Sequence, residues 1–505
     1  MKRSSIVLLI FVLAKFLLQL TALLQPEYGI FRDELYYLAC TKHLAWGFVD
    51  HPPFSIAVLW AWVSIAGDSL VSLRIFAALI STIPVAMTGL ITRRLGGEWK
   101  AQALACFAVL LAPVQFSIGS FYSMNVIEYA LIPLLVLLLL RIIIEQKTSL
   151  WILFGALVGL GIMNKHTFAV LAAFILFGML LIPSRKEFMK IYFWIGMAIV
   201  GLFVLPNLIW QFSHNFISLE FYKNASTLKN VPTPPLKIFI DQLFASNPLA
   251  ALLWVTGLVW FLLGKERSEY RTLGIAFLLM LAMMMAAQSN CLDRIALFIP
   301  VLVAGGTVVW ERWNAKRFLR WLVPVTALLL LITGLVLLPM VLSIMSPSSA
   351  VQYLQQHGMQ TNFEKGISAE LPQLLADRFG WKELADSVGV VVHRIPEVDP
   401  HSIVLVGQNY GEAGAMEYYG RSLKLPRVIS GHNSYWLWGP GEQAEVYIVI
   451  GDSRSRMEQL LNDVQEGTRT SNGWQMNYER NLPIWICRKP KIHLEEFWPA
   501  AKMFI

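Results

Sequence analysis

The sequence predicts a mostly α-helical, polytopic membrane protein with a small soluble α/β domain at its C-terminus. Its 505 residues are 56% hydrophobic and 15% charged, whereas soluble domains average about 45–50% apolar and about 25% charged residues. Long apolar runs recur from residue 6 to about residue 342. From about residue 346, polar residues, turns and apolar–polar alternation replace these runs.

The first apolar run extends from Ile6 to Leu24 and follows Lys2 and Arg3. It is longer than the core of a signal peptide, and it lacks a small-residue cleavage site before Pro26. We therefore expect a retained membrane helix whose N-terminus lies in the cytoplasm.

Further runs approach the length of about 20 residues that a membrane helix needs, and together with the first they predict about eleven membrane helices. They lie near residues 70–92, 101–120, 124–143, 150–164, 167–183, 191–211, 247–263, 272–288, 294–310 and 319–342. The Trp-rich run 54–66 is short for a span, so we expect it to lie along the membrane interface.

Basic clusters near Arg93, Arg141, Arg185, Lys265 and Arg312 fall on the same predicted side of the membrane as the N-terminus. The positive-inside rule makes that side cytoplasmic. We therefore predict a multi-pass protein of the cell inner (plasma) membrane. Its transmembrane domain occupies residues 1–345, with a first outer loop at 25–69, and its extracytoplasmic α/β domain occupies 346–505.

Within the C-terminal domain, Ser402–Gly407 and Glu445–Ile450 are predicted to be strands. Gly380–Arg394 and Ser453–Val464 are predicted to be helices. Strands that alternate with helices are typical of an α/β domain.

The charge distribution and the cysteine spacing argue against nucleic-acid binding and against cysteine motifs that bind zinc or carry out redox chemistry. The net charge is +8, but the cations are scattered and form no basic stripe with interleaved aromatic residues, so nucleic acid is not an expected partner. The four cysteines form no CxxC pair, so the sequence supports neither a zinc ribbon nor a redox motif.

The first outer loop begins with Arg32, Asp33 and Glu34. Ionisable groups at a membrane boundary lose hydration and need partners, so such a cluster often marks a functional site. The two acids could cap a helix or pair with Arg32, or one of them could act as a general base towards an acceptor hydroxyl. Because only one of two neighbouring helical side chains can face a given cleft, we assign Asp33 as the base and Glu34 as its support.

The same loop ends with Asp50 and His51, followed by Pro52 and Pro53. The two prolines stiffen the backbone and fix the directions of the preceding side chains. A carboxylate and an imidazole suit Mg²⁺, Mn²⁺ or Zn²⁺, although two candidate ligands do not by themselves define a metal site. We regard Asp50 as the candidate ligand of a divalent metal.

Polar residues also accompany the run at 124–143, namely Tyr122, Asn125 and Glu128. A carboxylate that enters hydrocarbon costs about 2.5–3.5 kcal/mol on insertion scales, which predicts that Glu128 faces protein. A hydrogen bond to a neighbouring helix and a contact with substrate explain these residues equally well.

Another apolar stretch is interrupted by Asn164, Lys165 and His166. The lysine could extend to the interface, or it could hold the phosphate of a lipid head group. Asp293–Arg294, at another outer boundary, allows the same two interpretations. In the outer loop 211–247, His214 is a candidate metal or substrate contact.

Two motifs of the C-terminal domain, Asn409–Gly414 (NYGEAG) and Ser430–Gly439 (SGHNSYWLWG), combine aromatic side chains with Asn and His. Their aromatic faces could stack on sugars. Tight turns that dock this domain explain the two motifs equally well.

In this order, the Asp33–Glu34 pair, His51–Pro52–Pro53 and Asn164–Lys165–His166 resemble the dolichyl-phosphate-mannose-protein mannosyltransferase-like group of the GT-C superfamily (glycosyltransferase family 39 type). That group includes bacterial relatives that act on lipid A or surface glycans. The likeness covers roughly residues 1–340. It implies a membrane enzyme that uses a polyprenyl-phosphate-linked sugar outside the cytoplasm.

The resemblance also implies roles for single residues. Asp33 takes the position of the base, Lys165 that of the lipid-phosphate contact, and Asp50 a position that touches a metal in some relatives. We expect Arg294 and Arg32 to assist Lys165 in binding the donor phosphate. Relatives often carry an aspartate near the fourth helix, where this chain offers Asn125 and Glu128 instead.

The expected reaction is a single inverting displacement, in which Asp33 deprotonates the hydroxyl of a lipid, glycan or protein acceptor. A transporter or flippase for an anionic lipid-linked sugar is the alternative. It predicts repeated halves, which the sequence does not contain. A receptor is a third possibility, and it predicts that residues 346–505 bind glycan on their own.

Overall fold

The structure is a computed structural model, which describes residues 3–229, 232–264, 268–288, 298–316, 320–357, 369–396 and 398–505. The chain divides into two compact units. Unit 1 comprises Met1–Leu24, Val71–Trp210 and Val231–Ile344, and unit 2 comprises Gln25–Leu70, Gln211–Asn230 and Met345–Ile505.

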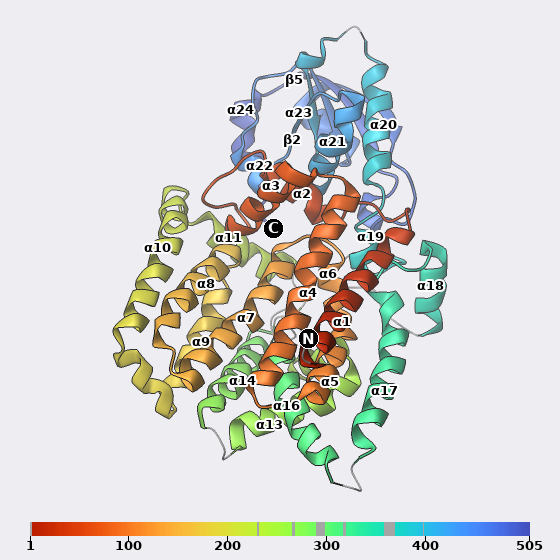
Figure 1. Cartoon of the computed structure of the whole chain (residues 1–505). Coiled ribbons are helices and arrows are strands. Elements are labelled where there is room, and N and C mark those ends of the chain that lie inside the picture. The colour runs from red at the N-terminus through yellow and green to blue at the C-terminus, as the bar shows by residue number, and fades with distance from the viewer. Residues whose placement is uncertain are drawn as a thin grey trace. The chain divides into compact units, whose positions relative to one another are not determined.

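Unit 1 consists of apolar helices (Figure 1). They are α1 (Arg3–Leu20), α4 (Leu70–Arg94), α5 (Trp99–Leu110), α6 (Pro113–Gly119), α7 (Met124–Glu145), α8 (Trp151–Asn164), α9 (Phe168–Leu180), α10 (Ile191–Ser213), α12 (Pro235–Ala245), α13 (Ala251–Leu263), α14 (Arg271–Ala286), α16 (Ile299–Asn314) and α17 (Leu322–Leu337).

Six helices among the described residues are long and apolar enough to cross a membrane, or up to nine if each bent helix pair counts as one span. The predicted number of about eleven spans is therefore not confirmed. Prolines account for part of the difference. Pro113 begins α6 after a bend of 61°, and Pro248 lies at a bend of 100° between α12 and α13, because proline cannot continue the helical hydrogen-bond ladder.

Small residues allow the helices of unit 1 to pack closely. A Cβ at Gly257 of α13 would collide with the main chain of Leu302, and one at Gly306 of α16 would collide with that of Leu253. Such close backbone approach is the usual way in which membrane helices gain packing contacts.

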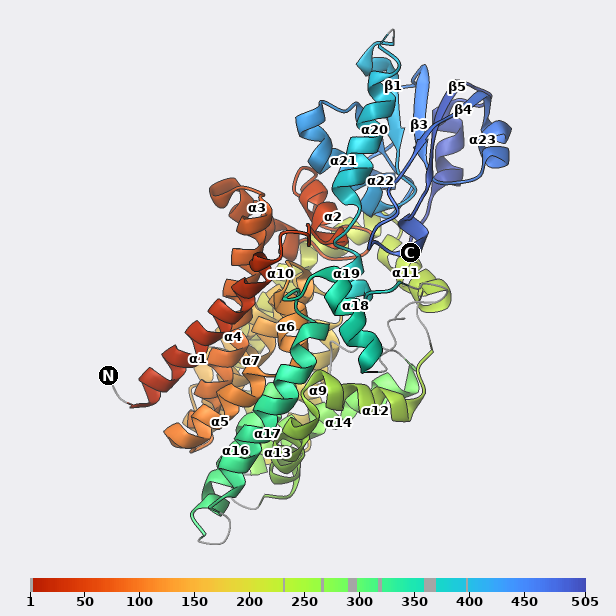
Figure 2. The ribbon, with the colours of Figure 1, turned by 90° about the vertical axis from the view of Figure 1, so that its right-hand side faces the viewer.

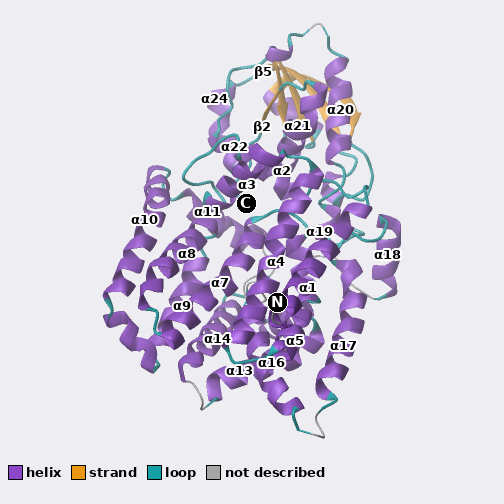
Figure 3. Cartoon of the chain, viewed as in Figure 1, coloured by secondary structure: helices purple, strands orange, loops and turns teal. Residues whose placement is uncertain are grey.

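Unit 2 combines short helices with one small sheet, the only strands among the described residues (Figure 3). Its helices include α2 (Arg32–Cys40), α3 (Phe54–Ala66), α11 (Ile217–Asn224), α18 (Pro347–Gln356), α20 (Trp381–His393), α21 (Tyr410–Leu423), α22 (Ser434–Leu437), α23 (Arg454–Leu460) and α24 (Leu494–Phe497). The run at 54–66 thus forms a separate helix of 13 residues.

The sheet has the order β2-β1-β3-β5-β4. The strands β1 (Ile403–Val406), β2 (Arg427–Ile429) and β3 (Val446–Ile450) are parallel, whereas β5 (Pro483–Pro490) runs antiparallel to β3 and to β4 (Leu461–Arg469). Figure 2 shows α20 and α21 beside this sheet. A mostly helical chain with a small C-terminal sheet was the predicted fold class, and it is confirmed.

The predicted strands at 402–407 and 445–450 and the predicted helix at 380–394 are confirmed as β1, β3 and α20. The predicted helix Ser453–Val464 is wrong in its last four residues. There α23 ends at Leu460, and Leu461 begins the strand β4, which pairs with β5. Pairing with a distant strand overrides the local helical pattern.

Candidate active site

Helix α2 begins at Arg32 because Glu34 caps it. Phe31, the N-cap residue, has an extended backbone, and its N–H donates to Glu34 Oε2 at 2.9 Å. A glutamate at this position satisfies one of the donors that the first turn leaves open. Glu34 is fully buried, so its carboxylate serves the helix end.

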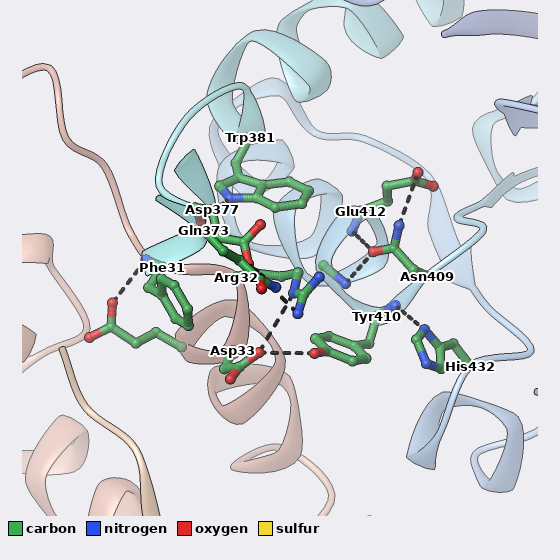
Figure 4. A network of polar contacts seen from close by, with 12 residues as sticks. Phe31, Arg32, Asp33, Gln373, Asp377, Trp381, Asn409, Tyr410, Glu412 and His432 are labelled. Carbon is green, nitrogen blue, oxygen red and sulfur yellow. Dashed lines mark hydrogen bonds and ion pairs between the residues drawn. The ribbon is translucent and has the colours of Figure 1, made fainter. Parts of the chain in front are cut away.

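Asp33 is the more accessible acid of the pair, with 35% of its side chain exposed. Its Oδ1 accepts a hydrogen bond from the Tyr410 hydroxyl at 2.9 Å and lies 3.7 Å from Arg32 Nε (Figure 4). A carboxylate with one oxygen held by a donor and partial access to solvent can accept a proton.

Arg32 lies among acids of its own unit. Its guanidinium is 3.7 Å from Asp377 Oδ2 and donates to the Tyr478 hydroxyl at 2.5 Å. Burial disfavours its charge, but Asp377 and the other negative groups around it raise the pKa of Arg32 well above its usual range. Arg32 therefore stays charged, with its charge matched by carboxylates.

Asp50 and His51 lie together at the other end of the loop. Asp50 Oδ1 accepts a hydrogen bond from the Tyr36 hydroxyl at 2.8 Å and lies 3.9 Å from His51 Nε2. Its side chain is 15% exposed, whereas that of His51 is fully buried beside the rings of Tyr37 and Phe48.

The His51 ring has a defined hydrogen-bonding direction. Its Nδ1 lies 3.0 Å from the carbonyl oxygen of Pro52, which can only accept, so Nδ1 carries a proton. Nε2 is buried and has no hydrogen-bond partner among the described residues. Asp50 and Nε2 together suit a divalent metal, but no group of three or more His, Cys, Asp or Glu ligands occurs in the described parts of the chain.

In unit 1 the structure brings Lys165 together with two candidates of α7, of which Asn125 lies 40 residues earlier in the chain. Lys165 Nζ donates to Asn125 Oδ1 at 2.8 Å and lies 3.0 Å from Glu128 Oε2. The contact between Lys165 and Glu128 is an ion pair, but its geometry is not that of a hydrogen bond. Glu128 is 4% exposed and Lys165 is 14% exposed at the side chain, so Glu128 faces protein, as predicted.

The remaining candidates have other partners. Tyr122 is buried and stacks on Phe76 at 5.2 Å between ring centroids. His166 Nε2 lies 3.0 Å from Asn207 Oδ1, and His214, in unit 2, lies 3.0 Å from the Ser213 hydroxyl through Nδ1. Arg294 lies outside the described residues.

The partners of Asp33 and Asp50, which are Tyr410 and Tyr36, could not be predicted from the sequence. Tyr410 belongs to the motif NYGEAG, but nothing in the sequence connects it with Asp33. The two residues are separated by 377 positions.

Comparison with known proteins supports the resemblance. Residues 50–210 match the family described as dolichyl-phosphate-mannose-protein mannosyltransferase. This range contains Asp50, His51, Asn125, Glu128 and Lys165 and begins after Asp33. The lipopolysaccharide core galacturonosyltransferase RgtB of Rhizobium johnstonii is 25% identical over 209 residues, which are 39% of this chain and 40% of that protein. The match thus spans less than half of that relative.

Solved structures resemble nearly the whole chain. ArnT from Cupriavidus metallidurans in the apo state has a TM-score of 0.62 at 13% identity, over 94% of this chain and 97% of its own. The same protein bound to undecaprenyl phosphate has a TM-score of 0.61 at 13% identity, over 95% and 97%. The archaeal oligosaccharyltransferase AglB from Archaeoglobus fulgidus, in complex with an inhibitory peptide and a dolichol-phosphate, has a TM-score of 0.51 at 11% identity, over 88% and 69%.

These findings support the resemblance that the motifs indicate: residues 50–210 match the dolichyl-phosphate-mannose-protein mannosyltransferase family, and the chain shares its fold with ArnT and with the oligosaccharyltransferase AglB.

Proposed function

We propose that the chain is a membrane glycosyltransferase that moves a sugar from a polyprenyl-phosphate-linked donor to a hydroxyl of a lipid, glycan or protein acceptor. The match of residues 50–210 to the mannosyltransferase family carries this proposal. The similarity in fold to ArnT, which binds undecaprenyl phosphate, supports the class of donor.

Asp33 is the general base of the proposed reaction. Its partly exposed carboxylate takes the proton of the acceptor hydroxyl as the hydroxyl oxygen attacks the anomeric carbon. The bond between that carbon and the phosphate oxygen breaks, and its electron pair leaves with the polyprenyl phosphate. A single displacement of this kind inverts the anomeric configuration.

Lys165 is the proposed contact of the donor phosphate, assisted by Arg294 and Arg32. Cations that are already in place where negative charge develops lower the barrier for departure of the phosphate. Asn125 and Glu128 hold the Lys165 ammonium in a fixed position. Glu128 also neutralises the charge of Lys165. A bound phosphate would therefore have to share the Lys165 ammonium with the Glu128 carboxylate or displace that carboxylate from it.

Asp50 and His51 Nε2 would hold a divalent metal, such as Mg²⁺, Mn²⁺ or Zn²⁺, if the reaction uses one. A bound metal supplies additional positive charge towards a phosphate. The buried, unpartnered Nε2 beside the Asp50 carboxylate supports this assignment.

We further propose a plasma-membrane location with about eleven spans, a cytoplasmic N-terminus and an extracytoplasmic C-terminal domain beginning near residue 346. The distribution of Lys and Arg in the loops supports this orientation.

The test uses the full-length protein in liposomes with undecaprenyl phosphate that carries radiolabelled mannose or galacturonic acid, together with a lipid A or oligosaccharide acceptor. Transfer releases free undecaprenyl phosphate and labels the acceptor. Asp33→Asn keeps the shape of the side chain but removes the base, so the rate should fall by about 100- to 10,000-fold.

Asp68→Asn is the matched control, because Asp68 also lies in residues 25–69 but pairs with Arg421. Full activity of Asp33→Asn would overturn the role of the base. Movement of the intact donor across the bilayer without its cleavage would instead favour the flippase. Glycan binding by residues 346–505 alone, without transfer, would favour a receptor.

A further inference from the structure

We infer that the C-terminal segment of unit 2 supplies positioning residues to the candidate active site: Tyr410 orients Asp33, and Ser434, acting through Tyr36, orients Asp50. The inference rests on the proposed function, which assigns chemistry to the two acids. It gives a role to the two motifs, NYGEAG and SGHNSYWLWG, that the proposed reaction leaves unexplained.

Tyr410 meets Asp33 through its hydroxyl. The side chain is 7% exposed, and the hydroxyl donates to Asp33 Oδ1 at 2.9 Å. Burial raises the pKa of Tyr410 well above its ordinary value. The charge of Arg32 lowers this pKa, whereas the nearby Asp33 carboxylate raises it. The hydroxyl therefore stays protonated and donates throughout the neutral range.

The ring of Tyr410 is itself fixed on several sides. Its centroid lies 4.8 Å from that of the tilted Tyr36 ring, 4.7 Å from that of the tilted His432 ring and 5.3 Å from the Arg32 guanidinium. These contacts hold the aromatic ring independently of the hydroxyl. A phenylalanine at this position would therefore keep the ring in place.

His432 in turn holds the backbone of Tyr410. The Tyr410 N–H donates to His432 Nδ1 at 3.2 Å, and His432 Nε2 lies 2.8 Å from the main-chain oxygen of Ile505. Burial lowers the pKa of His432 to about 3. The ring therefore remains neutral, with Nδ1 as acceptor and Nε2 as donor, and Figure 4 shows it beside Tyr410.

Two glycines of the first motif allow α21 to reach α2. A Cβ on Gly411 would lie 2.6 Å from Arg32 Cγ, and a Cβ on Gly414 would lie 2.9 Å from the main-chain carbon of Leu35. The neighbour of Gly414 is backbone, which cannot rotate away, so only glycine fits there without displacement. The sequence of the motif thus sets the distance between the Tyr410 hydroxyl and Asp33.

The second motif reaches Asp50 through a chain of hydrogen bonds. The Val49 N–H donates to Ser434 Oγ at 3.1 Å, and Ser434 Oγ lies 2.7 Å from the Tyr36 hydroxyl, which lies 2.8 Å from Asp50 Oδ1. An ionised carboxylate can only accept, so Tyr36 donates to Asp50 and Ser434 donates to Tyr36. The Ser434 N–H adds a second bond to the Tyr36 oxygen at 3.2 Å.

Both acids therefore have one oxygen held by a neutral phenol, and the two phenol rings are in contact, tilted by 31°. A donor that holds one carboxylate oxygen fixes the direction of the other and favours the ionised form that a base needs. Supporting residues of this kind determine how accurately a catalytic group is placed. The pH profile of kcat can also depend on the other titratable and charged groups around Tyr410, which are Arg32, Asp33, Tyr36, Asp50 and His432.

The test is Tyr410→Phe in the full-length protein in liposomes, with the donors named for the proposed function. Loss of a hydrogen bond to a carboxylate should lower kcat by about 10- to 100-fold, with little change in KM. The acid limb of the pH profile of kcat should move to higher pH by about one unit. A purely structural role would lower activity without moving the limb.

Tyr418→Phe is the matched control. Tyr418 lies on the same helix, and its hydroxyl donates to the main-chain oxygen of Asp68 at 2.9 Å. Ser434→Ala tests the second arm and should lower kcat more than Ser422→Ala, whose hydroxyl bonds to the oxygen of Tyr419. An unmoved pH limb in an active Tyr410→Phe protein overturns the inference.

A second readout separates this inference from the proposed function. Thermal unfolding of Tyr410→Phe, Asp33→Asn and the double variant reports the contact whether or not transfer occurs. With the bond present, the shift in Tm of the double variant should differ from the sum of the two single shifts. Additive shifts overturn the contact, whereas an inactive natural protein with non-additive shifts overturns only the glycosyltransferase assignment.

Discussion

Glu412 and Glu479 are two buried carboxyl groups that share one amide. Asn409 Nδ2 lies 3.2 Å from Glu412 Oε1 and 2.8 Å from Glu479 Oε1, and the Gln408 N–H donates to Glu412 Oε2 at 2.7 Å. Burial raises the pKa of Glu479 to about 7. Burial and the charge of Glu479 raise the pKa of Glu412 well above its usual value. At least one of the two acids therefore keeps its proton near neutral pH.

This pair should make the stability of unit 2 depend on pH. A carboxyl group whose pKa is higher in the folded state binds more protons when folded, at every pH between its two pKa values. The stabilisation from Glu479 is therefore complete below its ordinary value of 4.5 and is lost as the pH rises through about 7. Glu479→Gln keeps the acceptor for Asn409 but does not titrate, so its Tm should fall less between pH 5 and pH 8.

The measurement is thermal unfolding of both proteins at a series of pH values. Glu466→Gln is the control, because Glu466 is 40% exposed at the side chain and pairs with Arg469 on the surface of β4. It should follow the pH dependence of the natural protein. If Glu479→Gln also follows it, the raised pKa does not affect folding.

At the scale of elements, the close contact between α2 and α21 depends on glycine residues of α21. A Cβ on Gly414 would press on the main chain of Leu35, which cannot rotate away as a side chain could. Gly414→Ala should therefore destabilise the protein by about 1–3 kcal/mol through overpacking. It should also reduce transfer, since the shift would move α21 away from Asp33.

Gly389→Ala in α20 is the matched control for this substitution. Its Cβ would meet only the flexible ends of two side chains, Leu423 at 3.3 Å and Leu425 at 3.9 Å, and alanine is favoured over glycine in a helix interior. Its Tm should stay equal or rise. Thermal unfolding and the transfer assay compare the two variants, and an unchanged Tm of Gly414→Ala would contradict the close approach of the helices.

The elements that could be predicted from the sequence are those with a strong local pattern. The strands β1 and β3 are almost wholly apolar and are bounded by polar turns, and both were predicted. By contrast, β4 carries polar residues along most of its length, and its pairing with β5 depends on residues 483–490. The helix predicted at 453–464 is therefore correct only as far as Leu460, because the pairing that follows is not local.

The residues of the candidate site could be predicted from the sequence, but their partners could not. Acids at the ends of a membrane-flanking loop are visible in the sequence, and so is Lys165 inside an apolar stretch. Their partners are not visible, because the contacts with Tyr410 and Asn125 join positions 377 and 40 residues apart. The number of spans was predicted from apolar length alone, which does not register the bends at Pro113 and Pro248.

At the scale of the whole molecule, unit 2 is assembled from three separate stretches of the chain. Residues 25–70 supply α2, most of which is buried. Residues 345–505 supply the sheet and α21, and within this unit the Arg32 N–H donates to the main-chain oxygen of Asp377 at 3.0 Å. Neither stretch contains all the partners that its polar and apolar groups need.

Removal of residues 345–505 should therefore unfold the first loop as well. The chain that ends at Ile344 would expose the buried side chains of α2, such as Leu35, Tyr36 and Leu38, and would leave Arg32 without Asp377. Limited proteolysis should then cut residues 25–70 rapidly, whereas these residues resist cleavage in the full-length protein.

Coexpression of residues 1–344 and 345–505 as two chains provides the control, because it restores every partner without restoring the covalent link. Protection of residues 25–70 and transfer activity should both return, at least in part. The opposite result would be a protected loop in the shortened chain together with a stable, monomeric 345–505 fragment. It would mean that the C-terminal segment folds alone, and that the hydrogen bonds of Tyr410 and Ser434 to the loop are incidental to both folding and catalysis.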